Sequence, residues 1–408
     1  MPGANIVSGM WIFRVKRPPG SLPVFKARYV ARGFSHRQGV DFFQTFSPTL
    51  KSTAFLQGCL HEEIWLRRPP GFTGSFPAGT QWSLQRPVYG LRQAPREWHD
   101  TLRTTLATLG FAPSTADPSL FLRTDTTLPL FYVLVDVDDL IFATADTEAL
   151  AHVNSELQKR HTCRDLFEMT SYLGLRITRD RAQRTITLTQ SHMVQQVFQH
   201  FGFTCSSPQS TPLPTGHSLS SPPSDESVEP SGSYPELVGC LMYLMTCTRP
   251  DLAYPLSLLA HYVAPGRHRK VHWDAAKRVL RYLCSTSGMG LVLGGRARVV
   301  LTGHADASCV DDLATLRSSQ GYTFSLAIRI ANKNGFANRT KHIALRYFFV
   351  KDEIEKGRLE MSYCPTSEMA ADYLTKKLGK QKFEYCMLLT GQSHVSDTPE
   401  AKGSVGNN

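Results

Sequence analysis

The sequence predicts a mixed α+β protein with more than one domain. Apolar, β-branched runs of strand length, such as 133–142, occur together with stretches whose apolar residues have helical spacing, such as 94–109. A chain of 408 residues is long enough for two or three domains with separate cores. Its 41% hydrophobic and 10% aromatic residues are typical of a globular protein and exclude a disordered one.

Composition also narrows the functional class. No apolar run has the length of a transmembrane helix, and the N-terminus lacks a basic region with a cleavage site. We therefore expect an intracellular protein, cytoplasmic or nuclear, with no membrane partner. The nine cysteines are scattered singly, which predicts neither a zinc site nor a disulfide framework and fits a reducing compartment. The net charge of +11 and the pI near 9.2 favour a nucleic-acid partner.

Three carboxylates interrupt the strand-like run 133–142, namely Asp136, Asp138 and Asp139. Burying an unpaired carboxylate is costly, so the cluster must face water, a cation or a tight turn. Two adjacent aspartates at the tip of a β-hairpin can bind Mg²⁺ for phosphoryl transfer. Aspartate is also common in plain turns, and the motif taken alone favours that simpler interpretation.

A second feature is a row of basic residues near the N-terminus. In the segment 25–32, period-2 alternation places Lys26, Arg28 and Arg32 on one face of a strand. Such a row can bind phosphates through charge-assisted hydrogen bonds. The alternative is an ordinary solvated strand face.

A third feature is a glycine turn that leads into a helix within the segment 89–98. Pro95 suits the first turn of that helix. Helix N-termini attract phosphate, and Arg92, Gln93 and Arg96 would add side-chain donors there.

Further short motifs follow one another along nearly the whole chain. They are KARYVARGF (26–34), QTFSPT (44–49), STAFLQG (52–58), YGLRQAPREW (89–98), VDDLIFATAD (137–146), LVGCLMYLMTCTRPDLAYPLS (237–257), GHADAS (303–308), RTKHIALRYF (339–348) and AADYLTKKLG (370–379). In this order they resemble the reverse transcriptase of copia-type LTR retrotransposons, and the last three resemble that family's RNase H region. The resemblance implies a right-hand polymerase with fingers, palm and thumb, followed by a truncated RNase H-like α/β domain.

The resemblance also implies an activity and a set of site residues. The family synthesises DNA from dNTPs with Mg²⁺, and its partners are an RNA template, a DNA primer and the RNA–DNA hybrid. The implied catalytic residues and metal ligands are Asp138 and Asp139 in the palm, with Asp306 and Asp372 in the RNase H remnant. The implied nucleotide- and template-binding residues are Lys26, Arg28, Phe55 and Gln93. His342 lies near the family's late RNase H histidine, and it could equally be a surface residue.

The palm region departs from the family pattern. The family has a metal-binding aspartate five residues before its aromatic, and that position here is Leu50, which cannot bind a cation. The motif 44–49 also runs almost directly into 52–58, so a helix and a strand from the middle of the palm sheet are missing between them. A two-metal mechanism needs carboxylates from both strands. We expect no compensation by Asp136, because its charge would repel a primer phosphate.

The RNase H region has a second loss. The chain runs from the segment 318–326 through 327–337 directly into the motif 339–348. The stretch that would carry the two middle carboxylates of the family's four is therefore missing between them. Cys309 also stands where the pattern tends to have Trp. We therefore predict a catalytically impaired copy, damaged by deletion or by mis-joined exons. The alternatives are a non-enzymatic nucleic-acid-binding remnant and a chain that folds poorly.

The expected organisation follows from these motifs and from the apolar patterns. We expect fingers and palm over 1–145, a thumb-like segment over 146–205, a Ser/Pro-rich linker over 206–233, a helical connection over 234–286, a degenerate RNase H-like domain over 287–380 and a C-terminal tail over 381–408. Smaller expected elements are a helix near 147–160, strands around 172–178 and 184–189, a helix with Val194, Val197, Phe198 and Phe201 on one side, and a core stripe of Leu237, Leu241 and Leu244. The family polyprotein also carries capsid, protease and integrase parts, whose motifs are not seen here.

Overall fold

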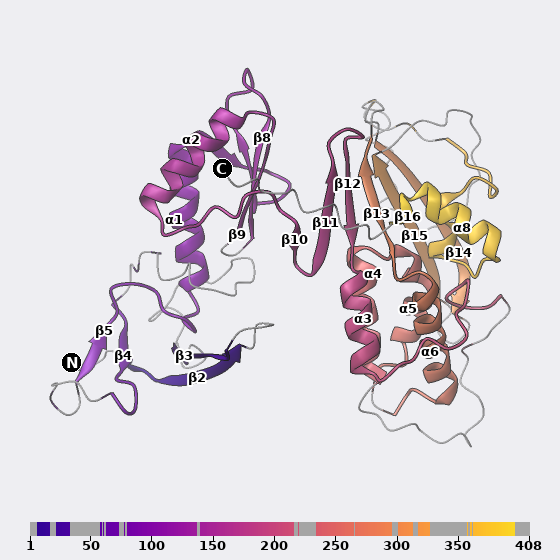
Figure 1. The fold of residues 1–408 in the computed structure, drawn as a ribbon, viewed down its shortest axis with the longest axis horizontal. Coiled ribbons are helices and arrows are strands. Elements are labelled where there is room, and N and C mark those ends of the chain that lie inside the picture. Colours follow the sequence, from indigo (N-terminus) through magenta and orange to yellow (C-terminus); the bar gives the residue numbers. More distant parts are fainter. Residues whose placement is uncertain are drawn as a thin grey trace, which may run out of the picture. The chain divides into compact units, whose positions relative to one another are not determined.

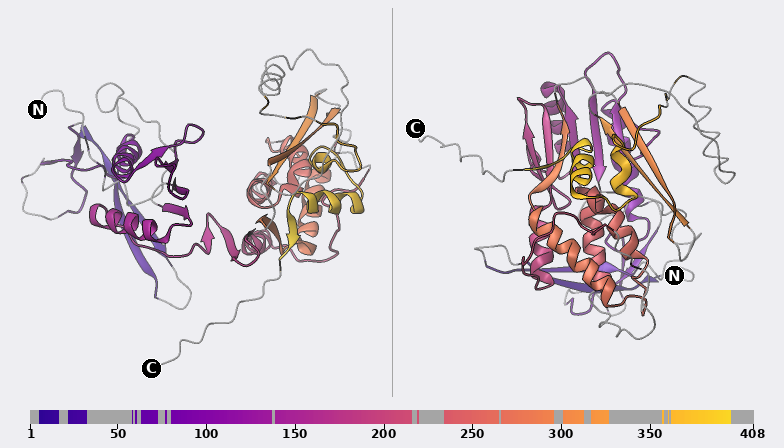
Figure 2. Two further views of the ribbon diagram at one scale, coloured as in Figure 1. Left: turned by 90° about the horizontal axis from the view of Figure 1, so that it is seen from above. Right: turned by 90° about the vertical axis from the view of Figure 1, so that its right-hand side faces the viewer.

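The computed structural model divides the chain into two compact units, Met1–Phe167 (unit 1) and Glu168–Asn408 (unit 2) (Figure 1; Figure 2). The unit boundary lies inside the predicted thumb-like segment 146–205, whose first helix belongs to unit 1 and whose strands belong to unit 2. The described residues are 6–16, 22–32, 58, 60, 63–72, 77, 80–136, 139–215, 219, 234–264, 266–295, 301–312, 317–326, 357, 360 and 362–395. Among them, no helix is both long and apolar enough to cross a membrane.

Unit 1 begins with two small sheets. The first has the order β1-β4-β5, with β1 parallel to β4 and β4 antiparallel to β5. The second is the antiparallel hairpin of β2 and β3. The bounds are β1 Ile6–Val7, β2 Gly9–Lys16, β3 Val24–Ala31, β4 Trp65–Arg67 and β5 Gln81–Ser83.

The main sheet of unit 1 is an antiparallel meander with the order β6-β7-β8-β9. Helices α1 and α2 share one hydrophobic core with this sheet, to which they contribute Trp98, Leu102, Leu106, Val153 and Leu157. The bounds are α1 Ala94–Thr108, β6 Phe111–Pro113, β7 Leu120–Arg123, β8 Phe131–Asp136, β9 Asp139–Thr144 and α2 Thr147–Arg160. The predicted helix near 147–160 is confirmed.

Local sequence explains where these helices start. Pro95 lies in the first turn of α1, where its missing N–H is not needed. The side chain of Asp146 caps α2 by accepting a hydrogen bond from the backbone N–H of Ala149 at 2.9 Å. Arg123 of β7 holds that carboxylate from the sheet at 3.1 Å. The N–H of Ala149 and the Arg123 guanidinium together lower the pKa of Asp146.

Unit 2 contains an antiparallel five-stranded sheet with the order β10-β11-β12-β13-β16. The sheet therefore joins strands from three distant parts of the chain. The bounds are β10 Ser171–Tyr172, β11 Leu175–Asp180, β12 Thr185–Thr189, β13 Met289–Gly294 and β16 Gln392–His394. A separate hairpin of β14 (Leu301–Asp312) and β15 (Arg317–Leu326) packs against the short helix η4 (Ala370–Leu374).

The helices of unit 2 form its hydrophobic core. The predicted stripe of Leu237, Leu241 and Leu244 is fully buried on α4, which confirms it as core. Three members of the predicted face of α3, Val194, Val197 and Phe198, are buried as well, whereas the fourth, Phe201, follows the end of the helix and is half-buried. The bounds are α3 Ser191–His200, α4 Tyr234–Cys247, η3 Pro250–Leu252, α5 Ala253–Ala260, α6 Lys270–Ser285 and α8 Lys380–Leu389.

Three features of unit 2 differ from the sequence predictions. Part of the predicted tail 381–408 forms regular structure, because all of α8 except its first residue and all of β16 lie within it, and α8 buries Phe383 and Met387. Part of the predicted exposed linker packs on α6, where Leu213 is buried. The prediction of no disulfide is wrong, because Cys205 and Cys284 form one across 79 residues. Each feature depends on a distant partner, which local composition does not encode.

Candidate functional site

The β8–β9 hairpin carries the carboxylates of the strand-like run 133–142. Alternate residues of β8 are buried, as in a strand with one face on the core. The last pair of the hairpin sets Asp136 of β8 directly opposite Asp139 of β9. Asp136 is half-buried and Asp139 is exposed, so the two carboxylates lie at the open end of the hairpin. Asp138 lies outside the described residues.

Within the described ranges, no third strand that carries a carboxylate lies in the sheet of this hairpin. Within those ranges, β9 pairs with β8 alone and ends the sheet. Phe55 and Leu50 both lie outside the described residues. No group of three His, Cys, Asp or Glu side chains that could hold a metal ion occurs in the part of the chain that the structure describes. Directly opposed like charges repel each other at the end of a hairpin.

The β2–β3 hairpin carries the basic row. Its register sets Arg14 opposite Lys26 and Ile12 opposite Arg28. Because side chains of a strand alternate between faces, Arg14, Lys26 and Arg28 share one face. The predicted member Arg32 follows the end of β3. Sequence reasoning missed the position of Arg14, because the register of a hairpin cannot be read from one strand.

The opposite face of this hairpin is aromatic. Trp11 stacks on Phe13 at 6.1 Å between ring centroids and contacts Tyr29 at 5.3 Å. The hydroxyl of Tyr29 donates a hydrogen bond to the carbonyl of Arg67, which fixes the hairpin to β4. The hairpin therefore presents cations on one face and aromatic rings on the other.

The loop before α1 packs against the end of β3. The N–H of Ala31 donates to the carbonyl of Tyr89 at 2.7 Å, and the guanidinium of Arg28 lies 5.3 Å from the Tyr89 ring centroid. Gly90 has φ of +90°, and a Cβ there would lie 1.9 Å from the carbonyl oxygen of Ala31. Only glycine permits that close approach. The structure thus brings Arg28 to this loop, but it buries Gln93, which is 1% exposed.

The two predicted RNase H carboxylates come together in unit 2. Asp306 lies on β14 and Asp372 on η4, and the ammonium of Lys376 lies 3.1 Å from Asp306 and 2.8 Å from Asp372. The hydroxyl of Thr375 also donates to Asp306. A Cβ at Gly321 would lie 2.6 Å from the Cβ of Leu374, so glycine lets β15 approach η4.

Lys376 occupies the space where these two carboxylates could hold a cation. Burial lowers the pKa of Lys376, but its hydrogen bonds to Asp372 and Asp306 outweigh burial and raise that pKa. Lys382 approaches the other oxygen of Asp372 at 3.8 Å. As arranged, this carboxylate pair does not fit a divalent metal. The spacing of four residues between Asp372 and Lys376 was the signal that sequence reasoning missed. His342 lies outside the described residues.

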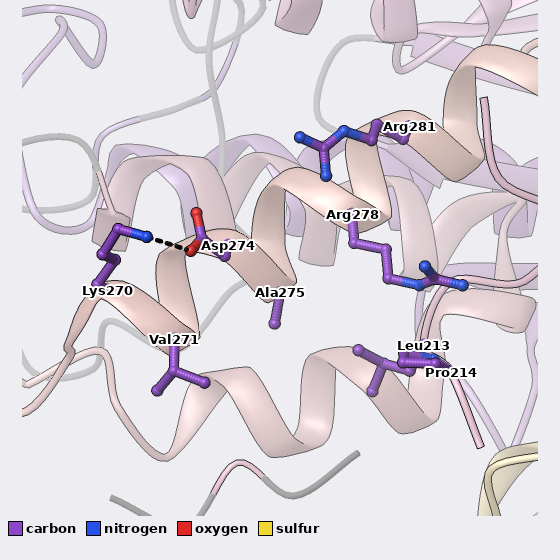
Figure 3. A pocket seen from close by; sticks show the side chains of 8 residues that line it. All are labelled: Leu213, Pro214, Lys270, Val271, Asp274, Ala275, Arg278 and Arg281. Carbon is purple, nitrogen blue, oxygen red and sulfur yellow. Dashed lines mark hydrogen bonds and ion pairs between the residues drawn. The ribbon is translucent and has the colours of Figure 1, made fainter. Parts of the chain in front are cut away.

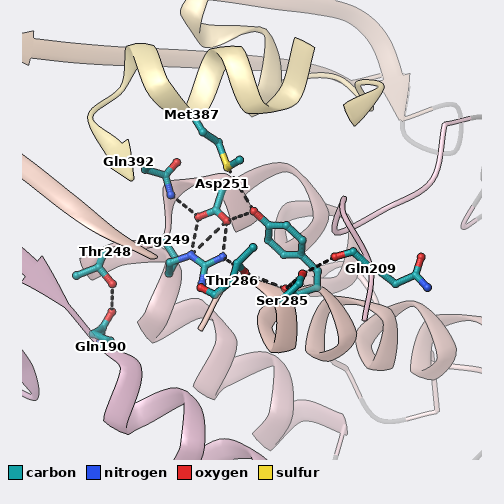
Figure 4. A network of polar contacts seen from close by, with 10 residues as sticks. Gln190, Gln209, Thr248, Arg249, Asp251, Ser285, Thr286, Met387 and Gln392 are labelled. Carbon is teal, nitrogen blue, oxygen red and sulfur yellow. Dashed lines mark hydrogen bonds and ion pairs between the residues drawn. The ribbon is translucent and has the colours of Figure 1, made fainter. Parts of the chain in front are cut away.

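A buried polar network that sequence reasoning did not predict surrounds Asp251 (Figure 4). Arg249 and Asp251 are both fully buried, and their side chains pair at 2.7 Å. Asp251 also accepts hydrogen bonds from the Tyr282 hydroxyl at 2.7 Å and from the Gln392 amide at 2.6 Å. Arg249 donates to the carbonyl of Thr286 at 2.9 Å. The network therefore joins η3, α6 and β16 inside the core of unit 2.

The charged state of this network follows from its geometry. Burial alone would raise the pKa of Asp251, but the Arg249 guanidinium and the donated hydrogen bonds outweigh burial and lower it. The carboxylate is therefore ionised, and its role is to hold elements together.

Comparisons with known proteins identify the family. The profile of the family "Reverse transcriptase (RNA-dependent DNA polymerase)" matches residues 51–215. A putative transposon Ty5-1 protein of Saccharomyces cerevisiae is 32% identical over 67% of this chain and 88% of its own length. The chain belongs to the copia-type retrotransposon Pol family. The retrovirus-related Pol polyprotein from transposon RE2 of Arabidopsis thaliana is 30% identical to this copia-type chain over 94% of the chain and 32% of the polyprotein.

One comparison bears on the predicted internal losses of this copia-type chain. The retrovirus-related Pol polyprotein from transposon TNT 1-94 of Nicotiana tabacum is 28% identical over 470 residues, which cover 93% of this chain and 35% of the polyprotein. That alignment is longer than the 408 residues of the whole chain, so the relative has residues within the aligned region that this copia-type chain lacks. The chain spans about a third of the length of the two plant polyproteins. No solved structure matches it.

Proposed function

We propose that this chain is the reverse transcriptase and RNase H part of a copia-type Pol polyprotein, in a copy that is catalytically impaired. The reaction of an intact copy would be Mg²⁺-dependent transfer of nucleotides from dNTPs to a DNA primer on an RNA template. One observation carries the impairment: the described carboxylates Asp136 and Asp139 come from a single hairpin, and among the described strands β9 pairs with β8 alone. Two-metal phosphoryl transfer needs ligands that hold both ions and the reacting oxygens in line.

The TNT 1-94 alignment supports the same proposal. An alignment longer than the chain is expected if segments have been lost inside the matched region. The sequence places one such loss before residue 52, where the missing palm strand would supply a further metal ligand, and a second one before residue 339. In this proposal Asp138 remains a palm metal ligand with Asp139 as its neighbour. Phe55 keeps its implied role beside the incoming nucleotide, and the buried Gln93 would take part there only after becoming accessible to the nucleotide.

Binding of nucleic acid would survive the loss of catalysis. Arg14, Lys26 and Arg28 form a cationic row on one face of the β2–β3 hairpin, and the chain has a net charge of +11. Opposed cations such as Arg14 and Lys26 repel each other, and a phosphate group relieves that repulsion. We therefore propose RNA–DNA hybrid as the ligand of the impaired copy. A non-enzymatic nucleic-acid-binding remnant is the second candidate function.

Primer extension separates these possibilities. Purified protein is incubated with poly(rA)·oligo(dT), labelled dTTP and either Mg²⁺ or Mn²⁺, beside the variant Asp138→Asn. The proposal expects no extension above that of the variant, together with salt-dependent binding of the hybrid. Extension that Asp138→Asn abolishes would overturn the proposed impairment. The variant Asp136→Asn would then test whether Asp136 has replaced the missing ligand.

A further inference from the structure

A pocket of about 420 Å³ lies beside helix α6 in unit 2 (Figure 3). Its volume is within the range of about 300–1,000 Å³ that is usual for ligand sites. One wall is α6, and Leu213 and Pro214 of the segment after α3 contribute to the other side. Neither the polymerase proposal nor the carboxylate pair in unit 2 uses this pocket.

The pocket is positively charged. Lys270, Arg278, Arg281 and Asp274 line it, which gives a formal charge of +2. Lys270 pairs with Asp274 at 3.1 Å, so the net charge resides on the two guanidinium groups. Within the described residues, no carboxylate forms an ion pair with either arginine.

Arg278 has unused hydrogen-bonding capacity. Its Nε is buried and has no hydrogen-bond partner, while its Nη2 reaches the hydroxyl of Thr211 only at 3.5 Å. A buried donor without an acceptor is destabilising. Arg281 lies three residues further along the same helix, a spacing at which like charges repel. Burial and the charge of Arg281 both lower the pKa of Arg278. An anion in the pocket would accept a hydrogen bond from the Nε of Arg278 and would weaken the repulsion between Arg278 and Arg281.

The opposite wall of the pocket is held in place on α6. The N–H of Gln209 donates to the carbonyl of Arg281 at 3.2 Å, and the hydroxyl of Ser285 donates to the carbonyl of Gln209 at 2.7 Å. The disulfide of Cys205 with Cys284 fixes the start of the same loop. The cavity is therefore formed before any ligand binds, which lowers the entropic cost of binding.

We propose that this pocket binds a phosphate group of the nucleic-acid backbone. The inference rests on the proposed nucleic-acid function and adds a contact in unit 2, whereas the β2–β3 hairpin belongs to unit 1. Guanidinium groups match phosphate oxygens through paired hydrogen bonds, and Arg278 beside the apolar side chains of the pocket suits a phosphate with its sugar, while Arg281 adds charge further along α6. The contact would be independent of base sequence, because phosphates carry no sequence information.

The test compares the full chain with two variants. Arg278→Gln/Arg281→Gln removes both pocket charges. Lys277→Gln is the matched control, because Lys277 is on the same helix but stacks on Trp273 outside the pocket, with its Nζ 5.4 Å from the ring. Fluorescence anisotropy measures binding of a labelled RNA–DNA hybrid at a series of KCl concentrations. Thermal unfolding in sodium phosphate, against NaCl of equal ionic strength, measures binding of the free anion and shows that each variant is folded.

We expect the slope of log K against log salt to fall by about 1–2 in the double variant, with the wild-type slope kept in Lys277→Gln. We also expect phosphate to raise the Tm of the wild type but not of the double variant. Equal slopes in the double variant and the wild type would overturn the inference and leave the proposed function standing. If phosphate stabilises only the wild type and no protein binds the hybrid, the nucleic-acid assignment and the proposed function both fail.

Discussion

The ammonium of Lys376 lies 2.8 Å from the carboxylate of Asp372 and bridges it to Asp306. Asp372 is almost fully buried, so its charge needs a partner inside the protein. In this copy that partner is a lysine four residues along the chain. The pair of acids that resembles a nuclease site therefore holds unit 2 together by joining β14 to η4.

Removing this lysine should destabilise unit 2. We expect Lys376→Ala to lower the free energy of unfolding by about 1–2 kcal/mol, because two carboxylates lose the ammonium group that they share. The loss is smaller than for a fully buried pair, since the Lys376 side chain is 38% exposed and water screens its charge. Urea denaturation measures the change.

Two additions sharpen that experiment. Lys380→Ala is the control, because Lys380 pairs with Glu384 at the surface at 3.9 Å and should contribute little. If Lys376 takes the position of a cation, Mn²⁺ should stabilise Lys376→Ala more than it stabilises the wild type. Equal Mn²⁺ effects on the two proteins would contradict this role for Lys376.

The buried pair of Arg249 and Asp251 predicts a larger effect. Arg249→Met should destabilise unit 2 by about 3–5 kcal/mol, because it leaves the buried charge of Asp251 without its guanidinium partner. Guanidinium chloride denaturation, followed by the fluorescence of Trp273, would measure it. The double variant Arg249→Met/Asp251→Asn should recover part of the loss. A double variant no more stable than the single one would contradict the assignment of the loss to an unpaired charge.

The same carboxylate predicts a dependence of stability on pH. The pKa of Asp251 in the folded protein is lowered from its usual value of 3.8. The unfolded state therefore binds the proton more readily, and Asp251 contributes stability that is fully present well above pH 3.8. That contribution is lost as the pH falls below this value and through the lowered pKa of the folded state. The free energy of unfolding between pH 7 and pH 3 should thus fall more steeply in the wild type than in Asp251→Asn. Parallel profiles would show that other acids cause the decrease.

The disulfide of Cys205 with Cys284 gives a fourth prediction. It closes a long loop between the segment after α3 and the end of α6. Cys205→Ser should lower the stability of the oxidised protein by about 2–4 kcal/mol. Peptide mapping without reductant should recover the linked peptides from the wild type. Cys163→Ser is the control, because Cys163 is free and exposed. An unchanged Tm of the wild type upon addition of dithiothreitol would argue against the bond in solution.

Local patterns were enough to predict the elements that bury a regular face. The helical spacing over 147–160 and the leucines of α4 are confirmed because each pattern matches the period of its element. The strands of the β8–β9 hairpin follow from the apolar run in the same way. The mixed α+β class is confirmed by the described sheets and helices.

Features that depend on tertiary contacts were not predictable in this way. The position of Arg14 opposite Lys26 requires the register of two strands, and the disulfide requires two loops to meet. Helix α8 has a short apolar face among charged residues, so the sequence predicted a tail there. The helix is identified only from the core of unit 2, in which Phe383 is buried. In the sequence, Arg249 is only one residue of a family motif, and nothing there predicts the buried ion pair that it forms with Asp251.

Primer extension by the full chain on poly(rA)·oligo(dT), with Asp138→Asn measured beside it, tests directly whether this copy is catalytically impaired. We expect well-folded protein to bind the hybrid in a salt-dependent way but to extend the primer no further than the variant does. Extension in Mg²⁺ that Asp138→Asn abolishes would contradict it, because a complete metal site would then exist despite the missing strand.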